Sequence, residues 1–407
     1  MTVTATPRQR LTAVRAAALF DGTGDTLTPN PVVTVDPGTG LIVSVGTAPP
    51  DGADVVDLGA ATLLPGLVDG HVHLAFDASV DPVAALAERD DEAAYTAMLE
   101  AARRTAAGGV TTVRDLGDRG YLSLRLREAA RTDRTLPTIV ASGPPITTPG
   151  GHCHYLGGAA AGIEGVRLAV RDHAARGVDV IKIMASGGNI TAGSRPELSQ
   201  YTAAELRAAA DEAHAHGLPI TAHAHGLRTV RDALAAGVDG LEHVTLMTVD
   251  GIDKIPDDLV AALAAAPVTV GLTLGMVLVP GAPPPPNGIR ERIPAIIENA
   301  RTMYAGGVDL IAGTDAGLGP GKPADVLRSA VGMLTTWVGM TPAEALRTST
   351  ARAAEVIGLG ASKGRIAPGY DADLLAVDGN PLTDPAAIDR IKAVYVGGEP
   401  LPVTGRG

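Results

Sequence analysis

Cysteine and aromatic residues are almost absent from this chain of 407 residues. The single cysteine, Cys153, excludes an internal disulfide bond. Aromatic side chains make up 2% of the sequence, so alanine, valine, leucine and isoleucine must form the core. Hydrophobic residues reach 45%, which is enough to bury a large core and argues against disorder.

Basic clusters and long apolar runs are also missing. The N-terminal sequence MTVTATPRQRL lacks the apolar stretch of about 7–15 residues that a signal peptide requires, and no run of about 18 uncharged apolar residues follows. The 33 Lys and Arg residues are outnumbered by 45 Asp and Glu residues, for a net charge of −12. Because nucleic acids bind to basic surfaces, we expect a cytoplasmic protein that binds neither nucleic acid nor a membrane.

The two ends of the chain have the composition of short strands and turns. Strand-like segments are found at 11–18, 31–36, 41–45 and 54–58, and again at 373–377 and 391–396. Clusters of Gly, Pro and Asp separate them. Since chain termini commonly lie close together, we predict that residues 1–65 and 361–407 form one small composite β-sandwich domain.

Residues 66–360 repeat one unit, a helical stretch, a glycine and an apolar strand, as in DHAARGVDVIKIM and MYAGGVDLIAGTD. Glycine often ends a helix in the left-handed conformation, and continuous apolar strands are typical of a parallel sheet. The predicted strands are 63–70, 110–115, 137–142, 178–184, 218–223, 238–243, 267–273 and 308–315. This pattern predicts an α/β fold in which residues 66–360 form a (β/α)8 TIM barrel, with a doubly wound sheet as the alternative.

Histidines and an isolated lysine mark the ends of these strands. His71 and His73 follow the first strand at a spacing that puts both imidazoles on one side, where they can share a metal or simply hydrogen-bond to each other. Lys182 is embedded in the apolar fourth strand, where burial of an ammonium group is costly. A neutral amine there can react with CO2 to give a carbamate, whereas a lysine that reaches the surface is the structural alternative.

Three more strands end in residues that bind metals. The fifth ends in His223 and His225, the sixth in His243 and the eighth in Asp315. Active sites of TIM barrels are built at the carboxyl ends of the strands. The sequence therefore predicts a metal site at this rim.

Together these motifs resemble the amidohydrolase superfamily of metal-dependent hydrolases. The resemblance covers almost the whole chain, since DLGAATLLPGLVDGHVHL is similar to the crossing from sandwich to barrel and SKGRIAPGYDADLLAVDGNPL to the returning sandwich strand. The segments GGHCHYLGG, IKIMASGG, AHAHG, EH and GTDAG look like the branch of prolidase-like dipeptidases and ochratoxin-type amidases.

The resemblance implies two divalent metal ions, zinc above all, with manganese or cobalt as alternatives. The implied ligands are His71, His73 and Asp315 for the more buried metal and His223 and His243 for the second. A CO2-derived carbamate on Lys182 would bridge the two. A hydroxide between the metals would attack the substrate, while Asp315 would act first as general base and then as general acid.

Other histidines are candidates for substrate contacts. His152 lies in a long loop, 143–162, and is expected to polarise the substrate carbonyl, with a structural loop histidine as the alternative. His154 is a second candidate in that loop. Cys153 lies between them, but a nucleophilic cysteine is disfavoured because the metal hydroxide already supplies the nucleophile. His225 is expected to bind substrate, with simple packing as the alternative.

We expect hydrolysis of an amide bond in a small molecule, a dipeptide or an N-acyl amino acid. A mononuclear deaminase or cyclic-amidine hydrolase of the imidazolonepropionase type is disfavoured, because such relatives carry a glutamate where this chain has Gly226 and lack the lysine. A carbamate or lactone hydrolase and a non-catalytic scaffold are further alternatives. The apolar segment 272–289 predicts a hydrophobic wall, and the alanine-rich outer helices are compatible with a homo-oligomer.

Overall fold

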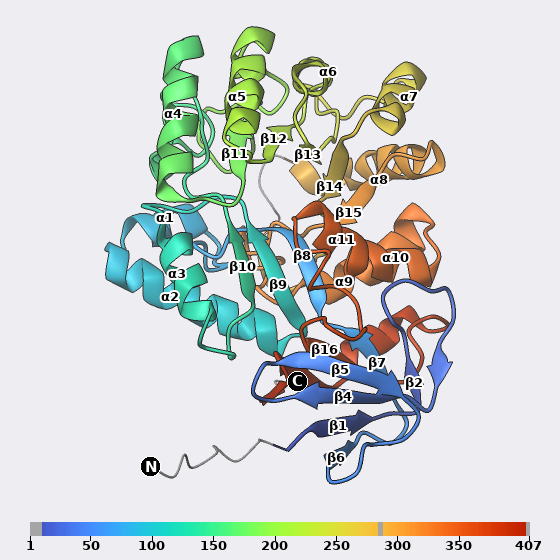
Figure 1. The fold of residues 1–407 in the computed structure, drawn as a ribbon. Helices are drawn as coiled ribbons and strands as arrows, with labels where there is room; N and C mark the ends of the chain where they lie inside the picture. The colour runs from blue at the N-terminus through green and yellow to red at the C-terminus, as the bar shows by residue number, and fades with distance from the viewer. Residues whose placement is uncertain (1–9, 284–287, 404–407) are drawn as a thin grey trace, which may run out of the picture.

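The computed structural model describes residues 10–283 and 288–403 and has a mixed α/β fold. Figure 1 shows short strands from both chain ends gathered at the bottom of the molecule, below a larger part in which helices surround a set of central strands. Among the described residues, no helix combines the length and the apolarity that crossing a bilayer requires.

The strands from the chain ends form two sheets. The four-stranded sheet has the order β5-β4-β1-β6. Its strands are β1 (Thr12–Arg15), β4 (Val32–Asp36), β5 (Leu41–Gly46) and β6 (Asp54–Asp57). The six-stranded sheet has the order β18-β17-β16-β7-β2-β3. It contains β2 (Ala18–Leu19), β3 (Thr28–Pro29), β7 (Ala61–Pro65), β16 (Leu374–Asp378), β17 (Ile391–Val396) and β18 (Glu399–Leu401).

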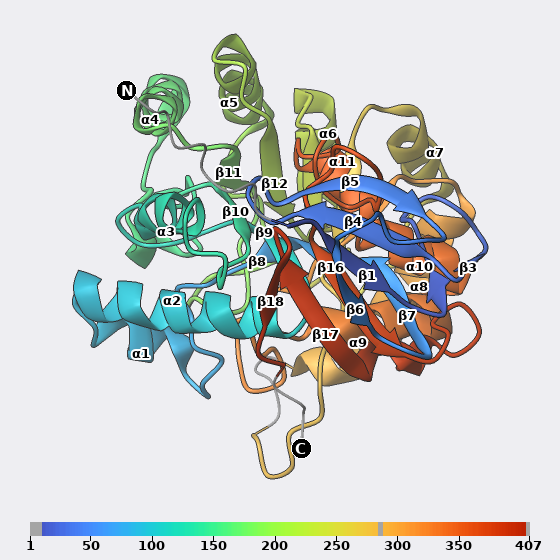
Figure 2. The same ribbon diagram turned by 60° about the horizontal axis from the view of Figure 1, so that its bottom comes forward.

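The six-stranded sheet joins the two chain ends. Strand β16 pairs antiparallel with β7, so that Leu374 faces Pro65, and β7 pairs in parallel with β2. Apolar side chains of both sheets, among them Val33, Ile42 and Leu63, pack into one buried cluster. Figure 2 shows the strands of the two sheets lying over one another.

Among the described residues, eight parallel strands form the centre of the larger part. They are β8 (Leu67–Val72), β9 (Val110–Asp115), β10 (Thr138–Ala141), β11 (Ile181–Met184), β12 (Ile220–Ala224), β13 (Gly240–His243), β14 (Thr269–Leu272) and β15 (Leu310–Ala312). They are grouped as β10-β9-β8 and as β11-β12-β13-β14-β15. Isolated parallel bridges link the two groups, between Val72 and Ala316 on one side and between Ile146 and Ile183 on the other.

Helices connect these strands and cover them from outside (Figure 1). They are α1 (Pro82–Ala87), α2 (Asp91–Ala107), α3 (Leu122–Ala130), α4 (Gly162–Arg176), α5 (Ala203–Ala215), α6 (Leu227–Ala236), α7 (Asp257–Ala265), α8 (Ile289–Ala305), α9 (Leu327–Met333), α10 (Pro342–Thr348) and α11 (Ala351–Val356). Local signals fix their ends. Thr202 and Glu205 form a capping box at the start of α5, and Gly177 ends α4 with φ 77° in the left-handed region.

The first predicted central strand was wrong in one respect. The prediction ran through 63–70 without a break, whereas the structure ends β7 at Pro65 and begins β8 at Leu67. Gly66 lies between them, and a Cβ atom there would be 2.1 Å from the hydroxyl oxygen of Thr111. A single apolar run therefore supplies β7 to the six-stranded sheet and β8 to the central parallel strands. The periodicity of the sequence alone does not reveal this division.

Candidate active site

The predicted site residues come from the carboxyl ends of the central strands. His71 lies in β8, Lys182 in β11, His223 in β12 and His243 at the last position of β13. Asp315 follows the short strand β15. All five side chains line one cavity of about 710 Å³. Its volume is in the range of about 300–1,000 Å³ that small-molecule sites occupy.

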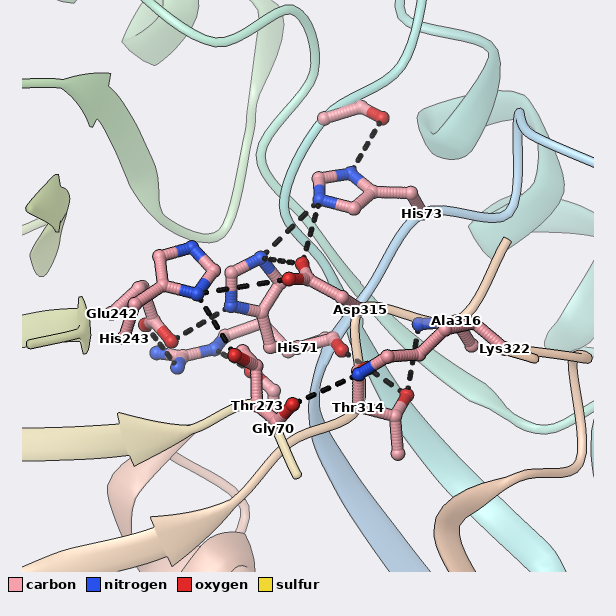
Figure 3. Close-up of polar contacts among 12 residues, drawn as sticks. Gly70, His71, His73, Glu242, His243, Thr273, Thr314, Asp315, Ala316 and Lys322 are labelled. Carbon is pink, nitrogen blue, oxygen red and sulfur yellow. Dashed lines mark hydrogen bonds and ion pairs between the residues drawn. The ribbon is translucent and has the colours of Figure 1, made fainter. Parts of the chain in front are cut away.

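His71, His73 and Asp315 lie in direct contact (Figure 3). The Nε2 atoms of the two histidines are 3.3 Å apart. The Asp315 Oδ1 atom is 3.1 Å from Nε2 of His71 and 3.4 Å from Nε2 of His73. Two imidazole nitrogens and a carboxylate oxygen at one point make up the donor set of a divalent transition metal.

The hydrogen bonds of these histidines fix which ring nitrogen carries the proton. His71 donates through Nδ1 to the Glu242 carboxylate at 2.9 Å, and His73 through Nδ1 to the Gly117 carbonyl at 3.3 Å. His223 donates through Nε2 to the Gly187 carbonyl at 3.0 Å. Because each partner only accepts hydrogen bonds, the opposite nitrogen of each ring keeps its lone pair for a metal.

His223, His225 and His243 form a second group with metal-ligand character. One nitrogen from each lies within 4.8 Å of the others, and His243 also belongs to a group of the same kind with His71 and Asp315. The His225 ring stacks on the His243 ring with centroids 4.7 Å apart, and its Nδ1 atom lies 2.8 Å from the Thr245 hydroxyl. His225 is thus a member of this group in the same way as His223 is.

Burial keeps these rings neutral. It lowers the pKa of His71 to about 4, and the nearby Lys182 charge acts in the same direction. Burial likewise lowers the pKa of His225 to about 4 and those of His223 and His243 well below the usual value. Burial opposes the charge on Asp315, but His71 and His243 hold its pKa well below the usual range. Neutral imidazoles and an ionised carboxylate are the protonation states that ligate metals.

Lys182 is the most unusual residue of the cavity. It is 1% exposed, and its Nζ atom has no hydrogen-bond partner among the described residues. Burial lowers its pKa to about 8, although Glu242 and Asp315 act in the opposite direction. An unpartnered buried amine costs about 1–3 kcal/mol. With its pKa lowered in this way, a larger share of this amine is neutral near pH 7 than of an ordinary lysine.

Two site residues adopt a backbone conformation that side chains disfavour. His243 has φ 77° and Asp315 has φ 58°, both in the left-handed region. Such conformations cost about 1–3 kcal/mol and are concentrated at functional sites. His243 is the last residue of β13 and Asp315 lies in the segment after β15, and both side chains line the shared cavity.

Glu242 and Arg114 were missed by the sequence analysis. Glu242 is 1% exposed and accepts hydrogen bonds from His71, from the Arg114 guanidinium at 2.8 Å and from the Thr221 hydroxyl at 2.7 Å. Burial opposes its charge, but Arg114 and His71 hold its pKa well below the usual range. On β14, a Cβ at Gly271 would lie 2.1 Å from the Glu242 carboxylate. The sequence offers one signal for this pair: Arg114 and Glu242 are charged residues within the strands β9 and β13.

Lys322 anchors the loop that carries Asp315. Its Nζ atom donates to the carbonyl oxygens of Thr273 at 2.9 Å and Thr314 at 2.6 Å (Figure 3). The Thr314 hydroxyl in turn donates to Asp69, a residue whose pKa burial raises to about 7. The lysine therefore ties together the segments that follow β14 and β15.

The loop histidines have different positions. His152 is buried, and its ring centroid lies 4.8 Å from that of His223. Gly188 makes room for it, because a Cβ there would be 2.2 Å from the His152 Nε2 atom. His154 is exposed and is not among the described residues that line the cavity, so the structure does not bring it to the site. Burial raises the pKa of Cys153 to about 12, which disfavours a thiolate nucleophile.

The family model for the amidohydrolase family matches residues 62–401. The chain belongs to the amidohydrolase family. Ochratoxinase of Aspergillus niger is 29% identical over 378 residues, covering 82% of this chain and 73% of that protein. Imidazolonepropionase of Chromobacterium violaceum is 30% identical over 358 residues, covering 80% of this chain and 79% of that protein. A crystal structure of a Xaa-Pro dipeptidase with methionine in its active site superposes with a TM-score of 0.83 at 26% identity. The superposition covers 96% of this chain and 99% of the dipeptidase chain.

These findings confirm the predicted family and its prolidase and ochratoxinase branch. This amidohydrolase is therefore a hydrolytic enzyme, and the family to which it belongs is metal-dependent.

Proposed function

We propose that this amidohydrolase hydrolyses an amide bond with the help of two divalent metal ions, most readily zinc. The observation that carries the proposal is the unpartnered, buried Lys182 amine in a cavity lined by two groups of metal-ligand atoms. A carbamate on this amine would replace a costly buried cation with a bridging carboxylate. Manganese and cobalt suit the same nitrogen and oxygen donors.

The proposed ligands are His71, His73 and Asp315 for one ion, His223 and His243 for the other, and Lys182 between them. The lone pairs left by the hydrogen bonds of His71, His73 and His223 support this set. When bound, two such ions would acidify a water molecule and polarise a carbonyl group.

The frame that holds these ligands is part of the proposal. The eight central strands would form one closed barrel, with the two bridges as its seams. The barrel domain would span residues 66–360. The strands of residues 1–65 and 361–407 would form the composite sandwich domain, in agreement with the pairing of β7 and β16.

The chain's own residues would move the protons and hold the substrate. The Asp315 carboxylate, whose pKa is held well below the usual range, would take a proton from water and return it to the leaving amine. His152 and His225 would contact the substrate, since both line the cavity beside His223. His152 has its pKa lowered to about 3, mainly by burial, so it would act as a neutral hydrogen-bonding group. We leave His154 out because it is exposed.

The proposed substrate is a dipeptide or an N-acyl amino acid. The likeness to a Xaa-Pro dipeptidase and to ochratoxinase supports an amide, and the cavity volume of about 710 Å³ accommodates a molecule of this size. A carbamate or a lactone is the nearest alternative because either presents a similar carbonyl group.

The likeness to imidazolonepropionase favours a second candidate, a mononuclear cyclic-amidine hydrolase. Two observations weigh against it. Lys182 has no evident use in a one-metal site. A Cβ at Gly226 would lie 2.5 Å from the Glu197 carbonyl oxygen, so the glutamate that such relatives carry there does not fit this backbone.

Metal content per chain distinguishes the two candidates. We expect two zinc ions per chain by mass spectrometry for protein expressed with zinc and bicarbonate, and chelation should abolish hydrolysis of a panel of dipeptides and N-acyl amino acids. Restoring the metal should restore activity. One metal per chain with activity only on cyclic amidines would favour the alternative, and full activity without metal would contradict both.

Glu242→Gln should weaken metal binding more than it weakens folding of the barrel strands. The amide cannot accept the His71 proton as strongly and leaves Arg114 without its counter-charge, so we expect about 10- to 100-fold weaker binding of one metal. Thr221→Val is the matched control, since it removes one hydrogen bond to Glu242 but leaves the carboxylate on His71. Metal titration with thermal unfolding measures both effects; equal metal affinities in the two variants would contradict the role of Glu242.

A further inference from the structure

Helix α8 turns an apolar stripe toward the active-site cavity. The cavity is lined by Ile289, Ile293, Ile296, Ile297 and Ala300 of this helix. Their spacing of three and four residues puts them on one face. In an ordinary amphipathic helix such a face is buried against the core.

The stripe is only partly buried. The buried residues of α8 are Asn299, Ala300 and Met303, all in its C-terminal half, whereas the four isoleucines keep intermediate exposure. The N-terminal half of the helix thus presents apolar surface to the cavity rather than to a strand. Partly exposed isoleucines gain free energy from any apolar group that covers them.

The surface continues across the cavity. Met276 and Val277, which follow β14, line the same cavity, as do Leu318 and Trp337. This agrees with the hydrophobic wall predicted for 272–289, of which 284–287 lie outside the described residues. We call the lining side chains of Met276, Val277, Ile289, Ile293, Ile296, Ile297, Leu318 and Trp337 the apolar compartment.

Charged groups are scarce in this compartment. Among the described residues that line the cavity, Asp315 is the one carboxylate, and it belongs to the metal ligands. Lys322 also lines the cavity, but its amine is bonded to two backbone carbonyls. Arg290, the second residue of α8, lines the cavity and is exposed.

We propose that the apolar compartment binds a large apolar group on one side of the scissile amide, so that the preferred substrates are N-acyl amino acids or dipeptides with a medium-length aliphatic chain or a ring. The proposal rests on the proposed amide hydrolysis and adds the substrate class to it. The compartment and the metal ligands share one cavity, so a substrate held by its amide at the histidines extends onto α8. Small polar dipeptides would leave the stripe uncovered.

Two substrate series test the proposal with the metal-loaded, full-length enzyme. In the first, acetyl, butyryl, hexanoyl and octanoyl groups are attached to one amino acid; in the second, one acyl group is attached to glycine, alanine, leucine and phenylalanine. Burial of one methylene group strengthens binding by up to about fourfold. In one of the two series, kcat/KM should therefore rise by about twofold to fourfold per methylene. The series that responds identifies the side of the amide held by α8.

Variants of α8 link the preference to the compartment. Ile293→Asn should lower the ratio of kcat/KM for octanoyl over acetyl substrate by about tenfold, and Ile293→Trp should shift the optimum to shorter chains by filling the space. Leu168→Asn on α4 is the matched control, since Leu168 is 66% exposed and does not line the cavity. A ratio of two substrates cancels any loss of folded enzyme.

The outcomes separate this proposal from the proposed function. Hydrolysis of both series with no dependence on apolar size would overturn the apolar compartment and leave amide hydrolysis standing. A size dependence that Ile293→Asn and Ile293→Trp do not change would also overturn it. Hydrolysis of no amide in either series would instead contradict the proposed function itself.

Discussion

Replacing Asp315 with asparagine should reduce kcat by at least about 10³-fold. The ionised carboxylate has its Oδ1 atom within 3.4 Å of two histidine nitrogens and its Oδ2 atom 3.6 Å from His243. Asparagine keeps the shape but loses the negative charge that binds a cation and the basicity that takes up a proton. Steady-state kinetics with metal content measured on the same sample will show whether the loss follows the metal or the proton.

Asp69→Asn is the matched control. Asp69 is also buried beside His71, accepting a hydrogen bond from its backbone N–H at 3.1 Å, but burial raises its pKa to about 7, so part of the population is already neutral near that pH. It does not line the cavity. We expect a loss in kcat of no more than about tenfold. Equal losses in the two variants would mean that Asp315 acts through the fold rather than through its charge.

Most of the candidate site could be predicted because its residues lie at strand ends. His71, Lys182, His223 and His243 each belong to a short apolar segment, and neighbouring parallel strands bring their carboxyl ends to the same side. The prediction needed no distances, only the order of strands and helices. The structure brings these residues to one cavity, as that order predicts.

The contacts that orient the ligands were beyond the sequence. Glu242 is adjacent to His243 in the chain, and its side chain meets His71 from β8 and Arg114 from β9. The alternation of side chains along a strand predicts that neighbouring residues face opposite sides. It does not predict which side chains from other strands they contact. His154 shows the reverse case, because a residue two positions from His152 in a loop has no fixed period and faces solvent.

The stripe of α8 illustrates a third limit. A repeat of isoleucines at helical spacing predicts an amphipathic helix, and the default partner of its apolar face is the core. Whether that face meets a strand or lines a cavity depends on how the helix packs in the tertiary structure, which the spacing of its isoleucines does not give.

Replacing Lys182 with alanine should lower metal content from two ions to one per chain and reduce kcat by at least about 10²-fold. The reason is the loss of the bridging group that the buried amine would carry. Alanine also leaves space where the side chain was, so formate, acetate or propionate can supply the missing carboxylate. We expect part of the activity and the second metal to return on addition of such acids, measured by kinetics and mass spectrometry.

Two further variants at this position isolate the carbamate from the charge. Lys182→Arg keeps a cation and fills the space, so it should be inactive and should not respond to short acids. Lys182→Met removes the unpartnered amine from a site that is 1% exposed, and it should stabilise the metal-free protein by about 1–3 kcal/mol while remaining inactive. A lysine kept only for folding would give the opposite result, a less stable Met variant. Full activity and two metals in Lys182→Ala without added acid would rule out the bridge.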